Sequence, residues 1–165
     1  MVTIKIFTAG ETIDKVYFDA KSTYEVGPPN ITKVLSGLNL NIKYSISSLL
    51  QKDSLEMDKS DRELIFKKVR SIDENRIIIT HGTDTMVATA KLLSKIKNKT
   101  IVLTGALEPA LFKTSDAIFN IGCAVAAVQT LPPNVYIAMN GQIFNYDNVK
   151  KNVANNRFVM INDIT

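Results

Sequence analysis

Four hydroxyl side chains follow apolar runs in this chain, each in a short stretch of small and polar residues: Thr12, Ser54, Thr83 and Thr104. A hydroxyl can cleave an amide or an ester when a base takes its proton and nearby donors stabilise the oxyanion. His81 is the only histidine, so the base would be a lysine, a tyrosine or a carboxylate, as in the Ser-Lys variants of triad chemistry. Serine and threonine are also common N-caps and turn formers, and spacing alone favours that structural role for each of the four.

The segment around Thr83 is predicted to be a strand, a loop and a helix. Residues 77–80 are a β-branched run of the kind that is buried on both faces of a parallel sheet. Thr83 is placed to be the N-cap of the following helix, whose apolar face is predicted at Met86, Val87, Ala90 and Leu93. Thr83 and Asp84 therefore fall where a strand end meets a helix N-terminus, the edge of an open parallel sheet at which ligands bind.

The rest of the chain alternates strand and helix signals, which is the pattern of a parallel sheet covered by helices on both faces. The sequence predicts an α/β fold with a three-layer, doubly wound and mostly parallel sheet, Rossmann-like or flavodoxin-like, and a hairpin flap. The expected strands of the sheet are residues 3–7, 41–47, 77–80, 100–103, 134–139 and 142–146.

Short local signals predict the flap, the turns and the helix starts. Strands at 16–18 and 23–26 would form the two arms of the flap hairpin. Asn30 is placed to cap a short helix, and the stretch from Ser60 to Glu63 has the spacing of a capping box. Asn140-Gly141 lies between two apolar stretches and is a typical hairpin turn signal.

The composition is that of an ordinary globular protein, with 165 residues, 45% hydrophobic residues, 22% charged residues and a net charge of +4. This length predicts one domain over residues 1–165 and no second domain. The lysines are spread along the chain, which favours a solvated surface over a nucleic-acid-binding patch. We expect no membrane partner, because the sequence has no apolar run long enough to span a bilayer and no recognisable secretory signal.

Cysteine and histidine each occur once, as Cys123 and His81. A single cysteine allows no disulfide framework, which favours a reducing, cytoplasmic location. One histidine and one distant cysteine make no zinc or iron ligand set. We therefore expect neither a metal nor another cofactor.

Six stretches of the chain together resemble, in order and spacing, the bacterial-type L-asparaginases. The most specific is the run from His81 to Met86, which is close to diagnostic of that family. The resemblance covers nearly the whole chain but only the family's amino-terminal domain, so the chain resembles a short, single-domain member with the carboxy-terminal domain absent. The stretches are Gly10-Glu11-Thr12-Ile13, Tyr24-Glu25-Val26-Gly27, Asp53-Ser54-x-x-Met57, His81-Gly82-Thr83-Asp84-Thr85-Met86, Gly105-Ala106-x-x-Pro109 and Lys151.

The resemblance implies two groups of catalytic residues. Thr12 would attack the side-chain amide carbon of asparagine, and Tyr24 on the flap would help to place and activate it. Lys151, held by Asp84, would draw the proton from Thr83, which orients water or a hydroxyl. The resemblance also implies a set of residues that binds the substrate and its charged α-groups: Gly10, Glu11, Asp53, Ser54, Thr83 and Asp84.

Some positions depart from the family pattern. Glu11 replaces the second of two glycines, and its side chain could crowd the site, repel the substrate carboxylate, point to solvent or replace a carboxylate that the missing domain would lend. Leu55 stands in place of a polar residue that touches the substrate amine, and Glu108 in place of an arginine. Lys150 could take the role of Lys151 after a shift of one residue.

The sequence thus predicts a cofactor-free amidohydrolase that converts L-asparagine to L-aspartate and ammonia, with Thr12 as the nucleophile. One alternative is a catalytically degenerate module that binds aspartate or asparagine without turnover, and another is a partner-binding α/β domain. His81 is expected to be structural, as in the family motif, and to bond the backbone near its loop. A homodimer or a higher homo-oligomer is also expected, because the lost domain would leave a surface that needs cover.

Overall fold

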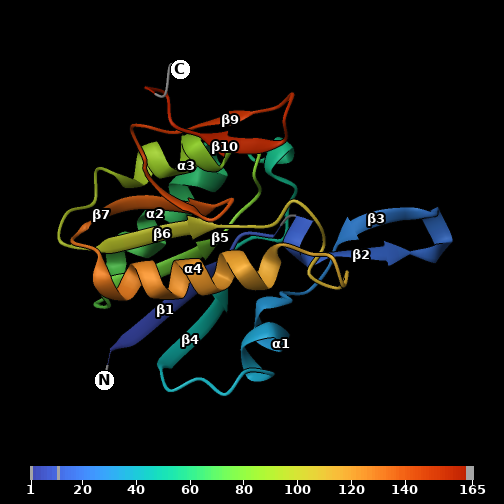
Figure 1. Cartoon of the computed structure of the whole chain (residues 1–165), viewed down its shortest axis with the longest axis horizontal. Coiled ribbons are helices and arrows are strands. Elements are labelled where there is room, and N and C mark those ends of the chain that lie inside the picture. Colours follow the sequence, from blue (N-terminus) through green and yellow to red (C-terminus); the bar gives the residue numbers. More distant parts are fainter. Residues whose placement is uncertain (1, 11, 163–165) are drawn as a thin grey trace.

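The centre of the computed structural model is a six-stranded sheet with the strand order β4-β1-β5-β6-β7-β8 (Figure 1). The structure describes residues 2–10 and 12–162. Neighbouring strands are parallel except for the β7–β8 pair, which is joined through the predicted Asn140-Gly141 turn. The doubly wound, mostly parallel α/β fold is therefore confirmed. The strands are β1 (Thr3–Thr8), β4 (Lys43–Ser48), β5 (Arg76–Thr80), β6 (Thr100–Thr104), β7 (Asn134–Met139) and β8 (Gln142–Asn145).

Two helices cover each face of the sheet, so the molecule has three layers. Ile77 and Ile79 point towards α2 and α3, whereas Ile78 points towards α1 and α4. All three isoleucine side chains are fully buried, which explains why β5 is an unbroken β-branched run without polar alternation. The helices are α1 (Ile31–Ser36), α2 (Lys59–Ser71), α3 (Met86–Leu93) and α4 (Ala117–Thr130).

Two helix starts differ from the sequence prediction. The capping box of α2 is made by Asp58 and Asp61, whose carboxylates accept the backbone N–H groups of each other at 3.0 and 3.1 Å. The predicted box from Ser60 to Glu63 is wrong because the helix already begins at Lys59. Thr83 is also not the N-cap of α3; Thr85 occupies that position, without a side-chain cap hydrogen bond.

The capping box of α2 leads to a first testable prediction. Replacing Asp58 with alanine should lower the free energy of unfolding, because the Asp61 N–H loses the carboxylate that accepts it, while the Asp61 carboxylate keeps the backbone N–H of residue 58 as its donor. Replacing Glu63 with alanine should cost less than about 0.5 kcal/mol. Urea denaturation of both variants measures the two costs, and a larger loss for Glu63→Ala would contradict the assignment of the box.

The predicted flap is present as a hairpin of β2 (Lys15–Phe18) and β3 (Thr23–Val26) that projects from the body of the molecule in Figure 1. Its base is fixed by Asp14, whose buried carboxylate accepts the Asn30 N–H at 2.7 Å. Asn30 directly precedes α1 as predicted, but its side chain does not cap that helix. Its amide group donates to the carbonyl oxygen of Ile13 at 3.3 Å, and it thus ties α1 to the flap.

The last part of the chain, where the sequence shows no strong periodicity, forms a second hairpin of β9 (Lys150–Asn152) and β10 (Arg157–Val159). Phe158 anchors this hairpin in the core beside α2 and α3. The Phe158 N–H also donates to Asn140 Oδ1 at 2.8 Å. The hairpin lies next to α3 in Figure 1, and it carries Lys151 to the edge of the sheet at which β5 ends.

Candidate active site

The loops that follow β4, β5 and β6 lie side by side and are bonded to one another. The Thr85 hydroxyl donates to the carbonyl oxygen of Ser54 at 3.0 Å, and the His81 N–H donates to that of Thr104 at 2.9 Å. β1 lies between β4 and β5, at the point where the strand order reverses. In open α/β sheets, ligands bind in the crevice outside the strand ends at this point, and the loops after β1 and β5 border it here.

Thr83, Asp84 and Lys151 form one connected group at this edge. Lys151 Nζ donates to Thr83 Oγ1 at 2.8 Å and to Asp84 Oδ1 at 2.7 Å. Thr83 is buried, and the Lys151 side chain is only 14% exposed, against 37% for Asp84. The amine therefore joins a hydroxyl to a carboxylate, an arrangement that can move a proton between Thr83 and Lys151 when the amine is neutral.

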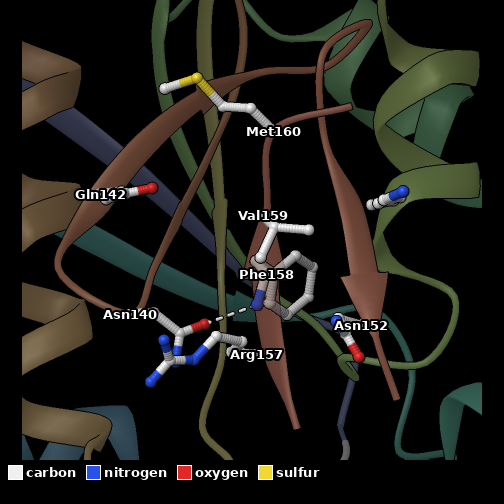
Figure 2. Close-up of a pocket in the computed structure, with 8 residues that line it drawn as sticks. Asn140, Gln142, Asn152, Arg157, Phe158, Val159 and Met160 are labelled. Carbon is white, nitrogen blue, oxygen red and sulfur yellow. Dashed lines mark hydrogen bonds between the residues drawn. The ribbon is translucent and has the colours of Figure 1, made fainter. Parts of the chain in front are cut away.

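Lys150 belongs to a different surface. Successive residues of a strand point to opposite faces, and Lys150 lines a separate cavity of about 510 Å³ whose other lining residues include Asn140, Gln142 and Arg157. Figure 2 shows Gln142 and Asn140 on one side of this cavity and Asn152 of β9 on the other. The geometry brings Lys151 to Thr83, although its catalytic role stays a prediction.

Asp53 and Ser54 lie in the loop after β4 and have structural contacts of their own. The Asp53 carboxylate accepts the Leu55 N–H at 3.0 Å and forms an ion pair with Lys15 of the flap at 3.2 Å. Ser54 is fully buried, and its carbonyl oxygen binds the Thr85 hydroxyl. Leu55 is 73% exposed. These contacts fix the loop beside the flap, and a role of Asp53 and Ser54 in substrate binding stays a prediction.

Tyr24 lies on β3 of the flap and is half exposed. Its ring makes edge-to-face contacts with Tyr17, at 5.4 Å between centroids, and with Phe112, at 5.8 Å. Tyr24, Lys15 and Asp53 line a hollow of about 350 Å³ between the flap and the loop after β4. Lys15 was not among the predicted site residues, because its pairing with Asp53 depends on how the hairpin folds back and no local pattern marks it.

The loop after β1 carries Gly10, Glu11 and Thr12. Thr12 begins a 3-10 turn (Thr12–Asp14) and is partly buried. Gly10 has a φ of +85°, and a Cβ atom there would lie 2.7 Å from the backbone nitrogen of Lys52. Glycine is therefore required for the close approach of the loops after β1 and β4. Glu11 lies outside the described residues, so each of its possible effects on the site stays a prediction.

His81 is fully buried and has only structural contacts among the described residues. Its Nδ1 lies 2.8 Å from the Gly82 carbonyl oxygen and its Nε2 lies 2.8 Å from the Thr89 hydroxyl. A carbonyl oxygen can only accept, so Nδ1 carries the proton and Nε2 accepts from Thr89. Burial lowers the pKa of His81 from 6.5 to about 4, which keeps the ring neutral at pH 7. The expected hydrogen bond to the backbone is confirmed.

The loop after β6 is fixed from two sides. The Asp116 carboxylate accepts the Leu107 N–H at 2.9 Å, and a Cβ atom on Gly105 would collide with the His81 carbonyl oxygen. Glu108, at the position where the family commonly has arginine, accepts the Thr114 hydroxyl at 2.7 Å and is exposed. The Glu108 carboxylate therefore forms a hydrogen bond within its own loop.

Comparison of the sequence with known proteins shows the family of this chain. A family model described as the N-terminal part of asparaginase matches residues 3–162. The chain belongs to the asparaginase family. A glutaminase-asparaginase from Acinetobacter glutaminasificans is 30% identical to this asparaginase domain, over 68% of this chain and 34% of the relative. An L-asparaginase from Thermococcus kodakarensis is 34% identical, over 73% of this chain and 39% of the relative.

The fold of the asparaginase domain is also that of solved structures. The thermostable L-asparaginase from Thermococcus kodakarensis superimposes with a TM-score of 0.85 and 25% sequence identity, over 98% of this chain and 52% of that one. The chain thus spans little more than a third of these curated relatives and about half of the solved chain.

Within the part of the chain that the structure describes, no helix has the length and continuous hydrophobicity of a membrane span. The same residues contain no group of three or more histidine, cysteine, aspartate or glutamate side chains that could hold a metal ion.

Proposed function

We propose that this asparaginase domain hydrolyses L-asparagine to L-aspartate and ammonia without a cofactor. The observation that carries the proposal is the position of Lys151 Nζ, within hydrogen-bond distance of both Thr83 Oγ1 and Asp84 Oδ1. A lysine in contact with a buried hydroxyl and an acid is a suitable proton carrier for amide hydrolysis that lacks a catalytic histidine.

The proposed reaction has two steps. Thr12 Oγ attacks the side-chain amide carbon, the C–N bond breaks, and the nitrogen leaves as ammonia with the proton of the hydroxyl. Water then cleaves the threonine ester and releases aspartate. Tyr24 places and activates Thr12, while Thr83 and Lys151 move protons with Asp84 holding the lysine.

The substrate would be held by its charged α-groups. Ser54 and Asp84 are the proposed partners of its α-carboxylate and α-ammonium, respectively, and Gly10, Glu11 and Asp53 are proposed to complete the binding surface. An acid is the natural partner of the ammonium group. The name of the Acinetobacter glutaminasificans relative includes glutaminase, so glutamine is the second amide that we propose to test.

Ammonia release from millimolar L-asparagine by the purified chain tests this function. Thr12→Ala, in which the proposed nucleophile is lost, measures the background of the assay. Turnover by the wild type above that background is expected. A folded wild type that releases no ammonia would contradict the proposal.

A second candidate function is a binding module that holds aspartate or asparagine without turnover. The departure from the family pattern at Glu11 favours it, because a side chain replaces a glycine beside the proposed nucleophile Thr12. Calorimetry that shows amino-acid binding without ammonia release would select this function.

The cytoplasmic location and the homo-oligomer stay predictions.

A further inference from the structure

The fold brings two basic segments of the chain together near the amino ends of β5 and β6. Residues 66–70 lie in the last turns of α2, and residues 95–99 connect α3 to β6. The two segments contain six basic residues and no aspartate or glutamate. Tertiary structure thus concentrates charges that are far apart in the sequence. The six residues are Lys67, Lys68, Arg70, Lys95, Lys97 and Lys99.

A hollow of about 320 Å³ lies between these segments. Four basic and two apolar residues line it, and no aspartate or glutamate is among its described lining residues. A hollow of this volume is about 8 to 9 Å across, less than the Debye length of about 10 Å at 0.1 M salt, so the charges around it act together on one ligand. The lining residues are Phe66, Arg70, Lys95, Ile96, Lys97 and Lys99.

Two of the four cations are held in place by the backbone. Lys99 Nζ donates to the carbonyl oxygens of Ile72 and Glu74, to the latter at 2.7 Å. Lys97 Nζ donates to the carbonyl oxygen of Ser94 at 3.1 Å. An ammonium group has three N–H donors, so both lysines keep a donor for a ligand. Their positions are therefore set before any ligand binds.

Acidic side chains do not neutralise the cations of this hollow. Among the residues that the structure describes, none of the four forms an ion pair with a carboxylate. The carbonyl ends of α2 and α3 attract cations, which accounts for a cation at each helix end but not for four around a single hollow. Like charges this close repel one another, and a bound anion would relieve that repulsion.

We propose that this hollow binds the phosphate groups of a small oligophosphate ligand, which is either a nucleoside triphosphate or inorganic triphosphate. Arginine and lysine are the usual partners of phosphate oxygens, and the planar guanidinium group of Arg70 can donate to two of them at once. A chain of phosphates carries several negative charges and can contact cations from both segments. A single carboxylate could not.

The extent of the basic surface favours a small ligand over a nucleic acid. Glu63 lies one turn before Lys67 on α2, and Asp73 and Glu74 follow the end of that helix. Acidic residues thus border the basic segment of α2 on both sides. A nucleic-acid footprint is a longer basic stripe, whereas a volume of about 320 Å³ is typical of a small-molecule site.

Phe66 can distinguish the two sources of the phosphate chain. It lies four residues before Arg70 and thus on the same side of α2, and its partly buried ring lines the hollow. A phenyl ring can stack on a nucleobase. A nucleoside triphosphate would use this ring in addition to the cations, and inorganic triphosphate would use the cations alone.

The proposed phosphate site is separate from the candidate active site. Lys99 directly precedes β6, and the candidate active site borders the loops at the other ends of the strands (Figure 1). β6 has five residues and spans about 16 Å at about 3.3 Å per residue. Ligand binding at this hollow can therefore be measured whether or not the chain releases ammonia.

Isothermal titration calorimetry with adenosine triphosphate and with inorganic triphosphate, in a chelator and at low salt, tests the site. We expect one ligand per chain with a dissociation constant of about 10 to 100 μM. Arg70→Glu should raise this constant at least about tenfold, because it replaces a phosphate donor with a like charge. Lys33→Glu changes the net charge equally on the exposed surface of α1, so this control should bind like the wild type. Circular dichroism checks that both variants are folded.

Phe66→Leu, which keeps an apolar side chain but removes the ring, identifies the source of the phosphate chain. Weaker binding of adenosine triphosphate alone would support a nucleotide, and unchanged binding of both ligands would support inorganic triphosphate. The proposal is overturned if the wild type binds neither ligand, or if Arg70→Glu and Lys33→Glu weaken binding equally. Much tighter binding of a short single-stranded oligonucleotide than of either triphosphate would also overturn it, in favour of a nucleic-acid surface.

Discussion

Replacing Lys151 with methionine should lower the rate of ammonia release at least about a thousandfold. Methionine keeps most of the length and apolar stem of the side chain but removes the nitrogen that binds Thr83 Oγ1 and Asp84 Oδ1. The proposed reaction then loses its proton carrier, while the fold loses one ion pair with a partly exposed carboxylate, which contributes little to stability. The rate constant for turnover of L-asparagine, measured with saturating substrate, checks this expectation.

Lys150 supplies the matched control for this experiment. Lys150→Met removes the same charge from the adjacent residue, but on the face of β9 that lines the separate 510 Å³ cavity. We expect this variant to keep turnover within about threefold of the wild type, since salt screens the effect of an exposed charge on the candidate site. Equal losses in the two variants would mean that net charge, and not the contact with Thr83, determines the rate.

The sequence alone could not distinguish the role of Lys150 from that of Lys151. The doubly wound sheet could be predicted because β5 is a β-branched run buried on both faces and because Asn140-Gly141 marks a hairpin turn. β9 and β10 have only three residues each, too few for any periodicity to indicate a strand. Without the strand, nothing in the sequence could tell which of two adjacent lysines faces Thr83.

The site itself was predictable in its residue types but not in its contacts. Thr83 follows a strand and precedes a helix, which is the ordinary place of an N-cap, and the structure instead uses its hydroxyl as an acceptor for Lys151. The Asp53–Lys15 ion pair joins a loop to the flap. Both contacts are tertiary, and local sequence patterns carry no information about them.

Replacing Asp14 with asparagine should raise the free energy of unfolding at pH 7 by about 1 to 3 kcal/mol, because a pKa difference of one between the folded and unfolded states corresponds to about 1.4 kcal/mol. Burial raises the pKa of Asp14 from 3.8 to about 6, against the opposing effect of its hydrogen bond from Asn30. A carboxyl group with a higher pKa in the folded state than in the unfolded chain contributes its full stability below the unfolded pKa of 3.8. That contribution is lost as the pH rises through about 6. Asparagine avoids the cost of burying a charge while keeping an oxygen that can accept from Asn30.

The measurement is the difference between the wild-type and Asp14→Asn curves of unfolding free energy from pH 4 to 8. The difference should be largest at pH 7 to 8 and should approach zero towards pH 4. Asp19→Asn, on the exposed turn of the same flap, should show no such difference. A difference that stays constant across this range would contradict the prediction, because a change in packing alone does not depend on pH.

His81 also shapes the pH dependence of the unfolding free energy. Its effect on stability has the opposite sign to that of Asp14 over nearly the same pH range. Burial lowers the pKa of His81 from 6.5 to about 4, so its contribution to stability is present above pH 6.5 and is lost as the pH falls through about 4. In the wild type, the gain from Asp14 on acidification offsets this loss. In Asp14→Asn the loss from His81 is unopposed, so this variant should lose stability more steeply than the wild type between pH 6.5 and 4. We therefore expect the free energy of unfolding of the wild type to change less between pH 6.5 and 4 than that of Asp14→Asn, because the opposite shifts of Asp14 and His81 partly cancel.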